Sequence, residues 1–200
     1  MIKLIKILSV FCVMVYLSGC ASTVISDIPL SNNQNIVNIR DKDRKKITFS
    51  ISYASDINEI YGKEVTENLK KKISKKLSES NLFKKVRYTE NPENFEKMHY
   101  HFNVVLSGSN TFQKELNTIV ALSTMMIVPT AEYYGIDISM HVTKNNNEIY
   151  SISAPQRIKD VFWLPYIFLS PFKNHSTAKA KIEDNALDYF LDEIVRERLY

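Results

Sequence analysis

Residues 99–106, with the sequence HYHFNVVL, carry the clearest strand pattern in the chain and decide its fold class. Every second residue from Tyr100 to Leu106 is apolar, and successive side chains of a strand point to opposite faces of a sheet. One face of this strand is therefore expected to be buried in a core. The polar stretch 107–110, which contains a glycine, predicts that the strand ends there.

The same alternation recurs on both sides of this strand. Ile47, Phe49 and Ile51 alternate with small polar residues, and a similar pattern covers residues 136–142. The asparagine-rich residues 144–148 then predict a hairpin, because asparagine tolerates the positive φ angles of tight loops. The predicted strands are residues 47–52, 82–88, 99–106, 136–142 and 149–153.

Two segments have the spacing of amphipathic helices. Apolar residues recur at intervals of four within residues 61–77, after a suitable cap at Ser55 or Asp56, and this helix is expected to end near 80–81. A second apolar stripe covers residues 176–195. These elements predict an α+β fold with two layers, in which a mixed or mainly antiparallel sheet of about five strands carries two amphipathic helices on one face.

The composition fits one ordinary globular domain. The chain has 200 residues, of which 44% are hydrophobic, with 26 basic and 22 acidic side chains. Only four glycines are present, so glycine-rich loops that bind phosphate are not expected. The motifs of serine hydrolases, zinc proteases and nucleotide-binding enzymes are missing. The sequence therefore predicts a protein that is not an enzyme and that needs no cofactor.

The first twenty residues have the pattern of an export signal. Lys3 and Lys6 precede an apolar run, residues 7–17, which is shorter than the roughly 17 to 25 residues of a membrane-spanning helix. The run ends in Leu17-Ser18-Gly19-Cys20, which resembles the lipobox of bacterial lipoproteins. An ordinary secretory signal with an incidental cysteine, or an N-terminal anchor helix, is the alternative.

The resemblance implies how the chain is processed and where it is held. In this family the signal is cut before the cysteine, which then carries a diacylglyceryl group on its sulfur and an acyl group, such as palmitate, on its amino terminus. Cys20 is thus expected to be lipidated, and several acyl chains hold a protein far more firmly than one. Ala21 follows it instead of the aspartate that favours inner-membrane retention in enteric lipoproteins. The expected location is the periplasmic face of the outer membrane.

The processed chain is expected to contain a tether and a domain. Residues 1–19 are predicted to be the removed signal peptide, residues 20–46 a lipid-anchored flexible tether and residues 47–200 a single α+β periplasmic domain. Such a tether keeps a domain within roughly 30 Å of the membrane. Because Cys12 would be removed and Cys20 lipidated, no disulfide, thiolate metal site or cysteine nucleophile is expected.

Two apolar segments are candidate contact surfaces. Residues 119–128 and 161–172 are largely apolar but too short to cross a bilayer. They either form the core under the sheet or contact a membrane, a partner or an acyl chain. The candidate contact residues are Met125, Met126, Ile127, Phe162, Trp163, Tyr166 and Phe168.

A run of lysines on the first predicted helix is a second candidate surface. It would suit anionic lipid head groups or an acidic partner, since each cation near an anionic membrane contributes about 1 kcal/mol. The alternative is a solvated helix face, which the small net charge of the chain favours. The residues of this basic face are Lys70, Lys71, Lys72, Lys75 and Lys76.

Three histidines are candidate ligands of a metal ion. His99, His101 and His141 lie opposite the apolar residues of their predicted strands, and three imidazoles are the ligand set of some catalytic zinc sites. The strand pairing that would bring them together does not follow from the sequence, and exposed or partly packed histidines are the alternative. No metal site is therefore predicted.

Together these patterns predict a non-catalytic lipoprotein of the cell envelope that acts by binding, as an accessory in envelope maintenance or assembly. Its expected partners are the membrane, through Cys20, and an envelope protein, whereas export argues against nucleic acid. Two alternatives stay open. One is a periplasmic protein that binds lipid or a small hydrophobic molecule against residues 119–172, and the other is a metal-assisted hydrolase.

Overall fold

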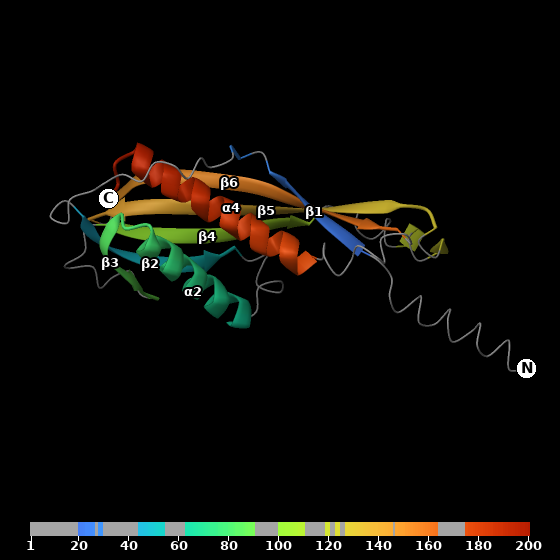
Figure 1. Cartoon of the computed structure of the whole chain (residues 1–200), viewed down its shortest axis with the longest axis horizontal. Helices are drawn as coiled ribbons and strands as arrows, with labels where there is room; N and C mark the ends of the chain where they lie inside the picture. Colours follow the sequence, from blue (N-terminus) through green and yellow to red (C-terminus); the bar gives the residue numbers. More distant parts are fainter. Residues whose placement is uncertain are drawn as a thin grey trace, which may run out of the picture. The chain divides into compact units, whose positions relative to one another are not determined.

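The structure is a computed structural model of the chain, and it describes residues 20–26, 28–29, 44–54, 63–90, 100–110, 119–120, 123–124, 127–145, 147–163 and 175–200. Six strands and two helices are found within these ranges (Figure 1). The strands are β1 (Cys20–Ser26), β2 (Lys45–Tyr53), β3 (Phe83–Tyr88), β4 (Tyr100–Asn110), β5 (Thr130–Lys144) and β6 (Asn147–Phe162). The helices are α2 (Lys63–Glu79) and α4 (His175–Arg196).

The strands form one mixed sheet in the order β1-β6-β5-β4-β2-β3. β2 is parallel to both of its neighbours, and its Ile47 lies beside Val86 of β3 and Tyr100 of β4. A parallel pair needs a long crossover, which α2 provides between β2 and β3. β5 and β6 are joined by two residues, a connection so short that it permits only an antiparallel pair.

The α+β class is confirmed, but the predicted sheet differs in two details. The described sheet has six strands instead of about five, because β1 lies upstream of the region predicted to fold. Its sequence, CASTVIS, gives no regular alternation of apolar and polar residues. Of the two predicted sheet types the mixed one is found. The parallel pairs on both sides of β2 were not foreseen, since alternation within a strand carries no information about its direction.

The chain divides into two compact units. Unit 1 contains residues 1–25, 110–135 and 157–182, and unit 2 contains residues 26–109, 136–156 and 183–200. Unit 1 therefore holds most of β1, the start of β5, the end of β6 and the first part of α4. Unit 2 holds β2, α2, β3, nearly all of β4 and the remaining parts of β5, β6 and α4.

The core of unit 2 lies between the sheet and its helices. α2 and the second half of α4 lie side by side over one face of the sheet (Figure 1), and Lys72 of α2 forms an ion pair with Glu183 of α4. The alternation predicted for β4 is confirmed, because each apolar side chain from Tyr100 to Leu106 on the predicted face is buried. Burial of such a side chain stabilises the fold by roughly 1.5–3 kcal/mol. Other buried side chains of this core are Ile47, Phe49, Ile73, Val142 and Ile194.

Two asparagines with positive φ angles lie where the sequence predicts element ends. Asn81 (φ 55°) follows α2 and Asn145 (φ 51°) follows β5, and asparagine accepts this left-handed backbone better than most residues. The predicted end of the central strand is wrong, since β4 continues to Asn110. The predicted helix caps Ser55 and Asp56 lie outside the described residues.

The segment predicted as a tether differs from that prediction at its start. Residues 20–26 form β1, which lies at one edge of the sheet beside β6. Residue 27 and residues 30–43 lie outside the described residues. Cys20 is thus the first residue of a sheet strand.

Candidate functional site

The candidate lipidation residue, Cys20, begins a strand that is held in place by neighbouring contacts. The two residues after it, Ala21 and Ser22, are buried. Thr23 Oγ1 donates a hydrogen bond to the carbonyl oxygen of Lys159 in β6, over 3.4 Å. A lipid on Cys20 would therefore be attached directly to unit 1.

The described part of the first apolar segment is exposed. Ile119 and Ile127 have 62% and 68% of their surface accessible, and Val120 and Val128 have 41% and 47%. Single exposed aliphatic residues are common, but four within ten residues favour a contact surface over a core segment. Of the predicted contact residues in this segment, Ile127 is exposed, whereas Met125 and Met126 lie outside the described residues.

Hydrogen bonds give this segment a local turn structure. The N–H of Thr124 donates to the carbonyl oxygen of Val120, and the N–H of Ile127 donates to that of Thr124, each over 3.0 Å. Pro129 follows, and β5 begins at Thr130. These bonds connect the exposed residues on either side of the turn.

Unit 1 exposes further large apolar side chains. Ile25 of β1 and Tyr133 of β5 are exposed, and Lys159 Nζ lies 5.7 Å from the centroid of the Tyr133 ring. Of the seven large apolar side chains exposed within the described ranges, six belong to unit 1, and Ile149 of unit 2 is the seventh. In the second apolar segment Phe162 and Trp163 are half-buried, while the predicted contact residues Tyr166 and Phe168 lie outside the described residues.

In the described part of unit 1, acidic and basic side chains differ in their accessibility to solvent. The two carboxylates among its described residues, Glu132 and Asp160, are 2% and 4% accessible. Its described basic side chains are half-buried or exposed, and they are Arg157, Lys159, Lys179 and Lys181. The accessible surface of the described part of unit 1 therefore combines aliphatic side chains with basic ones.

Each buried carboxylate of unit 1 has a specific partner that sequence analysis did not find. The Tyr134 hydroxyl donates to Glu132 over 2.6 Å, and His175 Nδ1 lies 2.9 Å from Asp160 Oδ2. The Tyr134 and His175 rings meet edge to face, with centroids 5.4 Å apart. The other oxygen of Asp160, Oδ1, is buried and accepts no hydrogen bond within the described structure. These contacts link the four side chains into one polar cluster.

This cluster orients an imidazole but does not complete a metal site. A carboxylate on one ring nitrogen fixes the orientation of His175, as in many histidines that act as bases or ligands. No group of three His, Cys, Asp or Glu side chains suited to a metal ion occurs among the residues that the structure describes. The sequence offered no apolar alternation around Glu132 and Asp160 that would have marked them as inward-facing.

His101, one of the three candidate histidines, lies in a buried hydrogen-bond network of β2 and β4. The hydroxyl of Ser50 donates its single proton to Asn103 Oδ1 over 3.0 Å, so it accepts a hydrogen bond from His101 Nε2, also at 3.0 Å. His101 Nδ1 then accepts from the hydroxyl of Thr48 at 3.1 Å. Burial lowers the pKa of His101 to about 4. A neutral imidazole with both nitrogens engaged is structural here and has no lone pair left for a metal.

The other two candidate histidines are not part of the His101 hydrogen-bond network within the described structure. His141 Nδ1 lies 3.1 Å from Ser151 Oγ and 3.3 Å from a carboxylate oxygen of Glu148. His99 lies outside the described residues.

Four of the five lysines of the predicted basic face have carboxylate partners. Lys72 Nζ lies 3.2 Å from Glu183 and 3.0 Å from Asp184, and Lys76 Nζ lies 2.7 Å from Asp188. Contact of this face with an anionic partner stays a prediction. Lys70 pairs with Glu67 and lies over the ring of Tyr88. Lys75 pairs with Glu79, and Lys71 is exposed.

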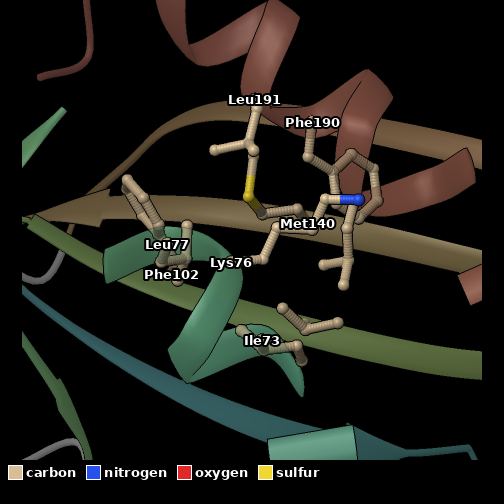
Figure 2. Close-up of a pocket in the computed structure, with 9 residues that line it drawn as sticks. Ile73, Lys76, Leu77, Phe102, Met140, Phe190 and Leu191 are labelled. Carbon is tan, nitrogen blue, oxygen red and sulfur yellow. The ribbon is translucent and has the colours of Figure 1, made fainter. Parts of the chain in front are cut away.

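A small void lies between α2, β4, β5 and α4 in unit 2 (Figure 2). Its volume is about 10 Å³, and apart from Lys76 its lining is apolar, with Phe102, Met140 and Phe190 among the residues around it. A void of this size holds at most a single water molecule. It is a packing gap in the core, too small for an acyl chain.

The described residues thus define an α+β fold with one mixed sheet and two helices. One unit exposes aliphatic and basic side chains. Neither described helix is long and apolar enough to cross a membrane. No family model matches the sequence, and the comparison with curated proteins gives no match.

Solved structures with a similar chain path are distant in sequence. The PelC dodecamer from Paraburkholderia phytofirmans is 8% identical, with 85% of this chain and 96% of that chain covered and a TM-score of 0.34. A DUF330 protein from Xanthomonas campestris is 8% identical, with coverages of 85% and 90% and a TM-score of 0.41. A minor lipoprotein from Acinetobacter baumannii is 9% identical, with coverages of 75% and 88% and a TM-score of 0.33. At these scores the likenesses carry no argument about function.

Proposed function

We propose that this protein is a lipid-anchored lipoprotein of the cell envelope that acts by binding rather than by catalysis. The observation that carries the proposal is the position of Cys20, which is both the last residue of the lipobox-like sequence and the first residue of β1. Cleavage before Cys20 leaves every described strand and helix in the processed chain. The lipid is then attached at the edge of the folded unit.

The proposed location and role of the protein follow from the sequence. Ala21 after the lipidated cysteine favours delivery to the outer membrane, with the domain in the periplasm. There the protein acts as an accessory in envelope maintenance or assembly, bound to the membrane and to an envelope protein. The exposed aliphatic residues of unit 1 support a role in binding.

The two alternative functions have less support from the described residues. The void of about 10 Å³ in unit 2 gives no support to a carrier of a small hydrophobic molecule, whose predicted cavity wall, residues 119–172, lies largely in unit 1 and partly outside the described residues. A metal-assisted hydrolase needs imidazole nitrogens that are available to a metal, whereas both nitrogens of His101 have hydroxyl partners.

Metabolic labelling with radioactive palmitate tests the proposal. The wild type and Cys20→Ser are expressed in a bacterium with a lipoprotein pathway, beside Cys12→Ser as a matched control in the signal segment. We expect label in the wild type and in Cys12→Ser, and no label in Cys20→Ser. The mature wild type should have the mass of residues 20–200 plus lipid. Label that persists in Cys20→Ser, or an unlabelled wild type, would contradict the proposal.

A further inference from the structure

We infer that the accessible surface of unit 1 is a second membrane contact, which places exposed aliphatic side chains among lipid acyl chains and basic side chains against anionic head groups. The inference rests on the proposed lipidation of Cys20 and adds to it a lipid-binding surface on the folded chain. Its occupant is a phospholipid bilayer that carries anionic head groups.

The position of the proposed anchor connects unit 1 to the membrane. Cys20 belongs to unit 1, and the next two residues are buried in it, so acyl chains on Cys20 bring this unit to the bilayer with no flexible segment between them. The exposed turn that contains Ile119 and Ile127 belongs to the same unit. The lipid and the exposed aliphatic residues therefore meet the same membrane.

Exposed apolar side chains are concentrated in unit 1 within the described ranges. Six of the seven large apolar side chains exposed within the described ranges are in unit 1, although unit 2 is the larger unit. If these residues only reflected ordinary surface composition, both units would share them. Tyr133, with Lys159 beside its ring, has the amphipathic character that is enriched at membrane interfaces.

Accessible charge also favours an anionic membrane. The accessible charged side chains in the described part of unit 1 are basic, whereas Glu132 and Asp160 are buried and have Tyr134 and His175 as partners. Basic side chains beside exposed aliphatic ones are the combination with which peripheral proteins bind anionic bilayers.

Vesicle flotation tests the surface apart from the lipid. The protein is produced as residues 20–200 with Cys20→Ala, and vesicles of neutral phospholipid are compared with vesicles that contain 30% phosphatidylglycerol, roughly the range of anionic membranes. We expect flotation with the anionic vesicles, several times weaker flotation with neutral ones, and a marked loss in high salt, which screens the basic residues.

Substitutions identify the residues that insert. In the same unlipidated protein we expect Ile127→Ser with Val128→Ser to lower the vesicle partition coefficient about tenfold, because two aliphatic side chains leave the membrane. Ile149→Ser is the matched control, since Ile149 is exposed about as much as Val128 but belongs to unit 2, and it should leave flotation unchanged. Thermal melting checks that each variant is folded.

The outcomes separate the inference from the proposed function. The inference is overturned, even where palmitate labelling succeeds, if the folded Cys20→Ala protein does not float with anionic vesicles. It is also overturned if the unit 1 variant and the Ile149 variant lose flotation equally. Flotation of this protein that depends on Ile127 and Val128 would support the inference even if labelling failed, in which case only the lipid anchor would be lost. Capture of an envelope protein through the same residues without any flotation would also overturn it.

Discussion

His101 couples the stability of unit 2 to pH. The folded state holds this imidazole neutral, because burial lowers its pKa to about 4, whereas an unfolded chain titrates near pH 6.5. Between these values the unfolded chain binds more protons than the folded one, so stability falls as the pH falls from about 6.5 to about 4. The contribution of His101 is complete above about pH 6.5.

Urea unfolding at two pH values checks this coupling. From pH 7.5 to pH 5 we expect His101 to account for a loss of about 2 kcal/mol in the free energy of unfolding. His101→Gln, which cannot titrate, should remove this part of the pH dependence. His141→Gln on the neighbouring strand is the control and should leave it in place. An unchanged pH dependence in His101→Gln would show that the imidazole is not held neutral in the fold.

Single residues also show why part of unit 1 could not be predicted. From Ile136 onward the buried positions of β5 are apolar and give the alternation that predicted a strand. The preceding buried positions hold Thr130 and Glu132, and the buried side chains at the unit 1 end of β6 include Asp160. Hydropathy marks such residues as exposed, because it does not record the partners that burial requires. The partner of Glu132 is Tyr134 of the same strand, whereas that of Asp160 is His175 of α4, which only the tertiary structure brings to β6.

At the scale of elements, ion pairs between α2 and α4 stabilise the helical layer of unit 2. Asp188 lies 2.7 Å from Lys76, and both side chains are about a quarter accessible, so water screens this pair less than a surface pair. We expect Asp188→Asn to lower the free energy of unfolding by about 0.5–1 kcal/mol at low salt and by less at 0.5 M salt, roughly the effect of added screening.

The matched control for this element is Glu79→Gln. Glu79 pairs with Lys75 within α2 at 3.8 Å, and both side chains are about two-thirds accessible or more, so its loss should change stability by less than about 0.3 kcal/mol. Urea unfolding of both variants gives the comparison. If the two substitutions lower the free energy of unfolding equally, the Lys76–Asp188 pair between the helices stabilises the fold no more than the surface pair within α2.

Most elements could be predicted because their periodicity is local. The strand at Tyr100–Leu106, the two helices and the hairpin at Asn145 all follow from spacing or turn chemistry, and the structure contains each of them. β1 could not be found in this way, because CASTVIS follows the predicted signal segment and has no alternation. The strand forms through pairing with a distant partner, β6, and the parallel directions around β2 depend on the same kind of long-range pairing.

At the scale of the whole molecule, the proposed function and the inferred surface give unit 1 two links to one membrane. The proposed lipid on Cys20 would supply a firm hold, and the aliphatic and basic residues of unit 1 would supply an oriented contact. Because β1 begins at Cys20, we predict a short, defined distance between unit 1 and the bilayer instead of the free movement that a tether of residues 20–46 would allow.

The depth of Val128 in the membrane tests this account most directly. A lipidated Cys20 leaves the processed chain without a free thiol, so Val128→Cys and, as a control, Ile149→Cys each accept a single environment-sensitive fluorophore. In the lipidated protein reconstituted into vesicles, we predict that the probe at 128 emits at shorter wavelength and is quenched by nitroxide-labelled lipid, while the probe at 149 reports water. If both probes report water, unit 1 does not contact the bilayer and the central claim is contradicted.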